Sequence, residues 1–158
     1  MTIQIGEKIP SVTLKVMGEE RPVDITTDEI FSGKKVVLFA LPGAFTPTCS
    51  AAHLPGFVVN LDAIKAKGVD TVVCMSVNDA FVMDAWGKAQ NAEHLMMLAD
   101  GNCEFSKALG LEREASAAGM GMRSKRFALI ANDGVVELLN IDEQGLDVSS
   151  AETVLAAL

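Results

Sequence analysis

The chain has 158 residues, 49% of them hydrophobic and 22% charged, a composition that excludes intrinsic disorder and predicts one globular domain spanning residues 1–158. Its 13 basic and 21 acidic residues leave a net charge of −8, and aromatic side chains are few, so we expect no nucleic-acid binding. Three cysteines are too few, and odd in number, for a scaffold built on disulfides.

The N-terminal residues MTIQIGEK contain neither the basic region nor the apolar stretch of a signal peptide, and no run of 18 apolar residues follows. We therefore expect a cytoplasmic protein without a membrane span, in a reducing compartment where free thiols persist. An organellar protein whose transit peptide had been removed would share these features.

The first predicted element is a buried strand at Val36–Leu41, a continuous apolar run rich in β-branched residues. A helix is predicted over residues 47–67, where apolar residues recur at helical spacing. Pro55 and Gly56 interrupt this helix and should perturb it, and Gly68 is a C-terminal stop.

The middle of the chain continues the alternation of strands and helices. Thr71–Val77 predicts a second buried strand, and the Asn-Asp pair after it can cap a helix over residues 80–90. Leu95–Leu98 predicts a third strand, and Cys103–Leu109 predicts a short helix.

Residues 119–125 are expected to be irregular. Phe127–Ala131 and Val135–Ile141 flank the turn sequence Asn-Asp-Gly, a strong hairpin signal, and a capping pattern precedes a last helix over residues 151–157. Alternating strands and helices that end in a hairpin predict an α/β fold, a mixed central sheet of the thioredoxin type with helices on both faces.

The segment PGAFTPTC, from Pro42 to Cys49, lies where a predicted strand gives way to a helix, a place where ligands gather in open α/β sheets. Thr46 suits the N-cap and Pro47 the first helical position, which places Cys49 in the first turn. Unpaired backbone N–H groups and the helix dipole there favour the nucleophilic thiolate of Cys49. A free Cys is otherwise usually a small buried filler, but this capping arrangement favours the reactive alternative.

His53 lies four residues after Cys49, on the same predicted helix face. A Cys–His pair at this spacing is a candidate base-activated nucleophile or half of a metal site. The chain has only one other His and no Cys-x-x-Cys pair to complete a zinc set, so a packing or hydrogen-bonding role for His53 is favoured. No metal and no cofactor are expected.

The other thiols, Cys74 and Cys103, are interpreted as structural. Cys74 falls inside the second predicted strand, and Cys103 opens a short helix where partial exposure is expected. A metal-binding module made of Cys49, His53 and Cys103 stays open as an alternative.

A basic cluster, RSKR, ends at Arg126, directly before the strand at Phe127. Such runs are usually solvated loop charges, but Arg126 abuts the strand and is therefore placed more firmly. A guanidinium that reached Cys49 would stabilise a thiolate and orient a peroxide or an oxyanion. The residues alone leave both interpretations open.

Several segments of the chain resemble those of the peroxiredoxins, and most closely the type II, or peroxiredoxin 5, subfamily. The resemblance covers essentially the whole chain in the family's order, through PGAFTPTCS at 42–50, HLPGF at 53–57, CMSVND at 74–79, LADG at 98–101 and RSKRF at 123–127. It implies a thioredoxin-like fold and a thiol-dependent peroxidase.

The family's roles carry over to the matching positions of this chain. Cys49 matches the peroxidatic cysteine, which attacks the peroxide and becomes a sulfenic acid. Thr46 matches the hydroxyl that hydrogen-bonds the peroxide and the thiolate. Pro42 matches the proline that shields the sulfur, and Arg126 matches the arginine that polarises the peroxide. The implied substrates are hydrogen peroxide and organic (alkyl) hydroperoxides.

The recycling step departs from part of the family. Some members carry a resolving Cys between the last strand and the last helix, where this chain reads GLDVSS. Cys74 matches a cysteine of the plant-like members, but a strand-core position is not expected to reach Cys49 without local unfolding. We therefore expect a one-Cys mechanism recycled by an external thiol, glutathione with glutaredoxin or alternatively thioredoxin.

The resemblance also implies a homodimer formed through the face around the active site, with Phe45 and Phe81 at the contact. A second interpretation of the same cysteine is a peroxide sensor or redox relay, in which oxidised Cys49 passes its oxidation to a partner protein.

Overall fold

The computed structural model describes all 158 residues, which form a central sheet covered by helices. The strands are β1 Thr13–Met17, β2 Pro22–Thr26, β3 Lys35–Ala40, β4 Thr71–Ser76, β5 Met96–Ala99, β6 Glu112–Glu114, β7 Met122–Ser124, β8 Arg126–Asn132 and β9 Val135–Asp142. The helices are α1 Thr27–Phe31, α2 Leu54–Ala66, α3 Ala80–Ala89, α4 Glu104–Ala108 and α5 Ala151–Ala156, with a π-helical turn at Cys49–His53 and a 3₁₀ turn at Ser116–Ala118.

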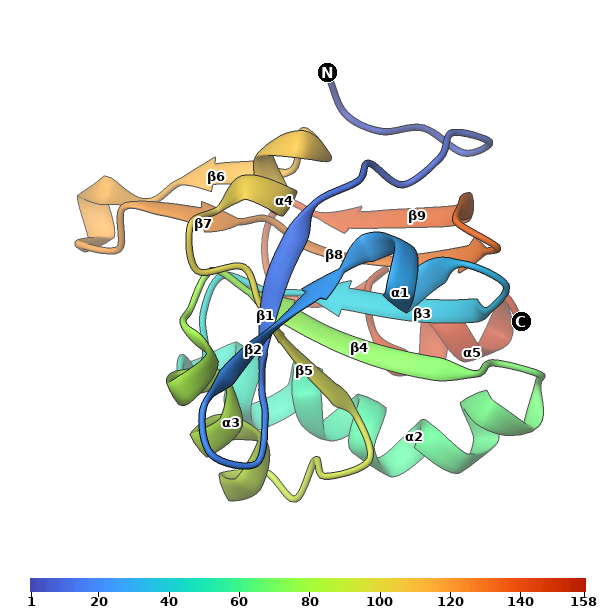
Figure 1. Ribbon diagram of the computed structural model, residues 1–158, viewed down its shortest axis with the longest axis horizontal. Coiled ribbons are helices and arrows are strands. Elements are labelled where there is room, and N and C mark those ends of the chain that lie inside the picture. The colour runs from blue at the N-terminus through green and yellow to red at the C-terminus, as the bar shows by residue number, and fades with distance from the viewer.

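Seven strands make one mixed sheet in the order β2-β1-β5-β4-β3-β8-β9 (Figure 1). The three central strands β3, β4 and β5 run parallel, and every other pairing in this sheet is antiparallel. This arrangement confirms the predicted α/β class with a mixed central sheet, because each parallel pair is joined by a helical crossover.

The sheet separates two hydrophobic cores, because successive side chains of a strand point to opposite faces. In β3, Val37 and Phe39 pack in one core with residues of α2, α3 and α5. Val36 and Leu38 pack in the other core with residues of α1 and α4. Helices on both faces are therefore confirmed, and the all-apolar pattern of the central strands follows from burial on both sides.

The turn between β8 and β9 is formed by Asp133 and Gly134, which have φ angles of 49° and 78°. Positive φ at both positions is the type I′ geometry that joins two antiparallel strands with a short loop, so the predicted hairpin is confirmed. The predicted stop at Gly68 is also correct, since its φ of +93° ends the α2 segment.

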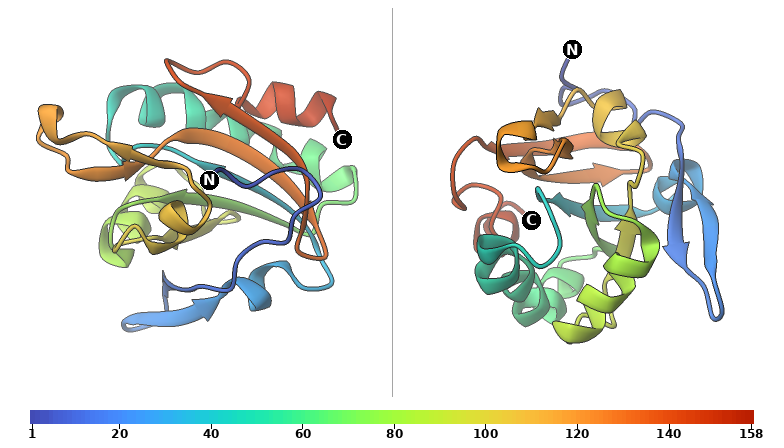
Figure 2. Two further views of the ribbon diagram at one scale, coloured as in Figure 1. Left: turned by 90° about the horizontal axis from the view of Figure 1, so that it is seen from above. Right: turned by 90° about the vertical axis from the view of Figure 1, so that its left-hand side faces the viewer.

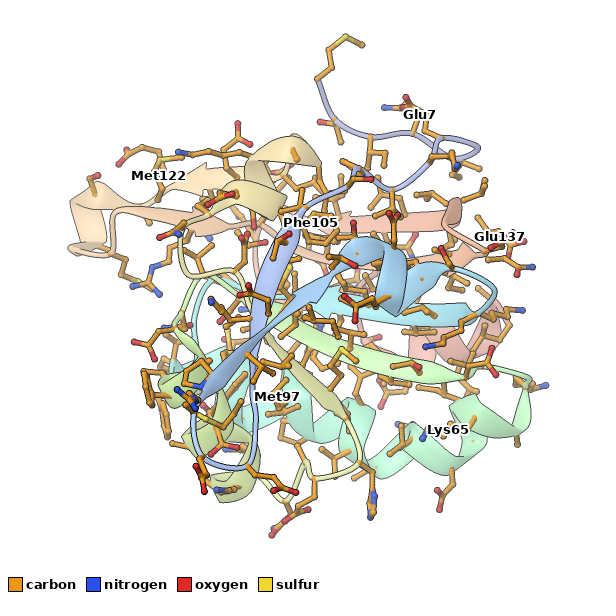
Figure 3. All side chains as sticks on the ribbon, in the orientation of Figure 1. Glu7, Lys65, Met97, Phe105, Met122 and Glu137 are labelled. Atoms are coloured by element: carbon orange, nitrogen blue, oxygen red, sulfur yellow. The ribbon has the colours of Figure 1, made fainter.

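The expectation of irregular structure over residues 119–125 was correct for residues 119–121 and 125 and wrong for residues 122–124. Residues 122–124 form β7, which pairs antiparallel with β6 in a separate two-stranded sheet. We call residues 112–124 the arm; it projects beyond the main sheet (Figure 2), and Figure 3 places Met122 on it. Strands of three mostly half-exposed residues carry too little hydrophobic periodicity to be predicted.

The β1–β2 hairpin, which forms one edge of the sheet, also had no counterpart in the prediction. None of the helices is both long enough and apolar enough to span a bilayer.

Candidate active site

Cys49 lies at the start of the helical segment that follows β3. Pro47 and Thr48 are the first helical residues, Cys49 opens the π-helical turn, and α2 continues from Leu54. The N–H of Leu54 donates to the Cys49 carbonyl, five residues back. Pro55 follows directly and has no N–H to continue the ladder, so the predicted perturbation takes the form of a π turn.

Thr46 occupies the N-cap position, as expected, since its carbonyl accepts the first intrahelical bond from the Ser50 N–H at 2.9 Å. Its hydroxyl, however, donates to the Gly43 carbonyl at 2.7 Å instead of accepting a bond from the first turn. The hydroxyl therefore stabilises the loop before the helix, and the turn that carries Cys49 has no side-chain cap.

The structure brings Arg126 and Cys49 together. Arg126 is the first residue of β8, and its Nη2 donates to the Cys49 Sγ at 3.3 Å. Both side chains are buried, with 8% of Arg126 and 1% of Cys49 exposed. The ion pairs of the protein involve other residues, so no carboxylate neutralises this guanidinium. A buried cation without an acidic partner presents its positive charge directly to the sulfur that it contacts.

His53 completes the contacts of the Arg126 guanidinium. Arg126 Nη1 donates to His53 Nδ1 at 2.9 Å, and His53 Nε2 donates to the Ser149 carbonyl at 3.0 Å. The ring packs against Phe39 and Phe57, at centroid distances of 5.1 and 5.8 Å. Burial, and secondly the charge of Arg126, lowers the pKa of His53 to about 4. The favoured hydrogen-bonding role is confirmed, since both ring nitrogens have protein partners.

Asp142, at the end of β9, was not singled out from the sequence. Its carboxylate accepts the backbone N–H groups of Asp147, Val148 and Ser149 and also the Ser149 hydroxyl. Burial alone would raise the pKa of Asp142, but these hydrogen bonds outweigh it and lower the pKa. They hold in place the segment whose Ser149 carbonyl meets His53.

Arg123, which the sequence placed only in a basic cluster, connects the arm to the loop that precedes Cys49. Its Nη1 donates to the carbonyls of Pro42 and Val77, at 3.4 and 3.2 Å, and its Nε donates to the Met120 carbonyl at 2.8 Å. The contact between Arg123 and Pro42 spans 81 positions of the chain. Such a contact leaves no local signal in the sequence.

The two remaining thiols lie in different surroundings. Cys74 is fully buried and belongs to the same hydrophobic core as Cys49; burial and the nearby Cys49 raise the pKa of the Cys74 thiol. Cys103 is 3% exposed, so the expected partial exposure was wrong: it packs beside Asp100 and Lys107, and burial raises its pKa.

No group of three or more His, Cys, Asp or Glu side chains is placed to hold a metal ion. The alternative module of Cys49, His53 and Cys103 is therefore not assembled.

The surroundings of Cys49 contain no large cavity. A cavity of about 460 Å³ lies between α3 and β5, lined by residues such as Gly87 and Met97. Two others, of about 300 and 230 Å³, also lie away from Cys49, Arg126 and His53. The candidate site is thus a small polar cluster around one buried sulfur, a geometry that suits a small reactant.

Comparison with known proteins gives matches over almost the whole chain. The redoxin family model matches residues 4–155. The chloroplastic peroxiredoxin-2E-2 of Oryza sativa is 49% identical over 99% of this chain and 73% of its own length, and peroxiredoxin-2D of Arabidopsis thaliana is 44% identical over 99% and 98%.

Solved structures give the same result. Reduced Prx3 from Vibrio vulnificus in complex with hydrogen peroxide is 55% identical, with a TM-score of 0.95 and 99% of each chain covered. Peroxiredoxin 5 from Alvinella pompejana is 32% identical, with a TM-score of 0.86 and coverage of 98% of this chain and 97% of that one. The chain therefore belongs to the redoxin family, and within it to the peroxiredoxins, thiol-dependent peroxidases with a thioredoxin-like fold.

Proposed function

We propose that Cys49 is the peroxidatic nucleophile of a one-Cys peroxiredoxin that reduces hydrogen peroxide and alkyl hydroperoxides. The observation that carries this proposal is the buried contact of 3.3 Å between Arg126 Nη2 and Cys49 Sγ, with no carboxylate on the guanidinium. An electrostatic partner of this kind stabilises a thiolate before the reaction and negative charge on oxygen during it.

The reaction is a displacement on oxygen. The thiolate sulfur attacks the terminal peroxide oxygen, an S–O bond forms, and the O–O bond breaks. The bonding pair leaves with the second oxygen, which takes up a proton and departs as water or an alcohol, while Cys49 becomes a sulfenic acid.

Three further side chains have roles in this proposal. Arg126 stabilises charge on the departing oxygen, and the Thr46 hydroxyl, which donates to the Gly43 carbonyl, can turn to donate to a bound peroxide. Pro42 shields the sulfur from one side.

The one-Cys part of the proposal rests on the surroundings of the other thiols. Residues 145–150 contain no Cys, and all three cysteines are free. The raised pKa of Cys74 keeps that thiol protonated and weakly nucleophilic. The sulfenic acid is therefore reduced from outside, by glutathione with glutaredoxin in the first instance and by thioredoxin as the alternative, in a reducing cytoplasm.

Peroxide consumption by four proteins tests this proposal. With glutathione and glutaredoxin, and in parallel with thioredoxin and its reductase, Cys49→Ser should lose turnover, whereas the matched controls Cys74→Ser and Cys103→Ser should keep most of it. Full activity in Cys49→Ser would overturn the assignment. A large loss in Cys74→Ser, with a Cys49–Cys74 disulfide in the oxidised wild type by mass spectrometry, would overturn the one-Cys route. Consumption of a single equivalent of peroxide would instead indicate a sensor or relay.

The homodimer belongs to the same proposal. Phe45 and Phe81 are 58% and 63% exposed, unusual for such large apolar side chains, and Phe45 adopts a φ of +63° that presents its ring beside Trp86. Phe45→Asp should shift the protein from dimer to monomer in sedimentation velocity, while Val59→Asp, at an even more exposed position on α2, should not. A wild-type protein that sediments as a monomer would exclude the dimer.

A further inference from the structure

The two ends of the Arg126 guanidinium have different partners. Nη2 donates to the Cys49 sulfur at 3.3 Å, and Nη1 donates to His53 Nδ1 at 2.9 Å. A guanidinium is planar and rigid, so a bond at one nitrogen restricts where the other nitrogen points. The contact between Nη1 and His53 thereby restricts where Nη2 can lie relative to the Cys49 sulfur.

The contact with Arg126 requires His53 to be in one particular protonation state. Nδ1 accepts from Arg126 and therefore carries no proton, while Nε2 faces the Ser149 carbonyl and must carry one. Protonation of Nδ1 would turn an N–H toward the N–H of Arg126, a repulsive arrangement. The lowered pKa of His53 agrees with this neutral form.

The Ser149 carbonyl is itself held firmly. The Asp142 carboxylate binds the Ser149 hydroxyl at 2.6 Å and the Ser149 N–H at 2.9 Å. A continuous set of hydrogen bonds therefore runs from the end of β9 through Ser149 and His53 to the guanidinium that touches the sulfur. Every group in it is at least nine-tenths buried.

We propose that His53 is a positioning residue for peroxide reduction: its Nε2–H tautomer, held by the Ser149 carbonyl, fixes the Arg126 guanidinium against Cys49. The inference rests on the proposed role of Arg126. A purely packing role does not require these contacts, because an apolar side chain could also pack against the Phe39 and Phe57 rings. An apolar residue at position 53 would leave an Arg126 N–H without a partner and the guanidinium free to turn.

The test measures single-turnover oxidation of Cys49 by hydrogen peroxide, by rapid quench and mass spectrometry. His53→Leu removes both hydrogen bonds, and His53→Gln keeps an acceptor and a donor. We expect oxidation to slow about 10- to 100-fold in His53→Leu, as for a misplaced catalytic group, and to recover largely in His53→Gln.

Arg126→Ala provides the reference, because His53 acts through Arg126. Oxidation should slow in Arg126→Ala, and adding His53→Leu to it should produce no further loss. Oxidation of His53→Leu within about twofold of wild type, or an equal loss from His53→Leu in both backgrounds, would overturn the inference. Wild-type oxidation in Arg126→Ala would instead refute the proposed role of Arg126.

A measurement on the unaltered protein applies even where His53→Leu fails to fold. The imidazole ¹⁵N chemical shifts of His53 distinguish its tautomers, and we expect a protonated Nε2 with a bare Nδ1 at neutral pH. A protonated Nδ1 would overturn the inference, since that nitrogen could not then accept from Arg126.

Discussion

The buried imidazole of His53 makes the stability of the fold depend on pH below neutrality. Burial and the Arg126 charge lower the pKa of His53 from its ordinary 6.5 to about 4. Between these two values the unfolded chain binds a proton that the native protein does not bind. The free energy of unfolding should therefore fall as the pH drops from about 6.5, and the contribution of His53 is lost by about pH 4.

The magnitude follows from the two pKa values. At 1.36 kcal/mol for each pH unit, the difference between 6.5 and about 4 corresponds to a loss of about 3 kcal/mol. That is a large fraction of the 5–15 kcal/mol that separates a typical folded domain from its unfolded chain. The charged groups that bear most directly on the imidazole are the Arg126 guanidinium and the Asp142 carboxylate.

Urea unfolding followed by circular dichroism measures this loss. Wild type is compared with His53→Gln at neutral pH and at about pH 4. The two proteins carry the same carboxylates, Asp142 included, so the difference between the two losses isolates the imidazole. We expect wild type to lose about 3 kcal/mol more than the variant over this range. Equal losses would refute the reasoning.

Two further predictions concern glycines. Gly110 and Gly119 both have a φ of +71°, but a Cβ at Gly110 would collide with the Met1 backbone, whereas a Cβ at Gly119 would meet nothing within 4 Å. In urea titrations, Gly119→Ala should lower the free energy of unfolding by about 1–2 kcal/mol, through its backbone angle alone. Gly110→Ala should lower it by about 1–3 kcal/mol more, because the added Cβ overpacks the site. Equal losses in the two variants would contradict this reasoning. Gly56→Ala, inside α2, would place its Cβ at an ordinary 3.6 Å from the Ala151 Cβ and should stabilise the protein by about 0.5–1 kcal/mol, so a lowered unfolding midpoint would count against it.

The elements predicted correctly from the sequence are those with strong local signals. Val36–Leu41 and Thr71–Val77 are long apolar runs and correspond to β3 and β4, strands buried on both faces. The cap at Asp79 is equally local, since its side chain accepts from the Val82 N–H three residues later. The arm and the β1–β2 hairpin lack such signals, because their strands are short or half-exposed.

The residues of the candidate site also divide into those with a local sequence signal and those without one. The helix start at Cys49 could be predicted because its cause lies within a few residues. Contact between Arg126 and Cys49 spans 77 positions, and contact between His53 and Ser149 spans 96. The residues alone left the Arg126 contact open, and nothing in them pointed to Asp142 or Ser149. These groups meet because the strands bring distant segments of the chain together, and no local sequence pattern predicts that placement.

The one tryptophan of the chain lies beside the candidate site. Trp86, on α3, donates its indole N–H to the hydroxyl of Ser50, the residue after Cys49, at 3.0 Å. Since the chain has no tyrosine, nearly all of its intrinsic fluorescence arises at this one place. The emission of the unlabelled protein therefore reports on the surroundings of Trp86, which include the first helical turn, so a rearrangement there can be followed optically without altering a single residue.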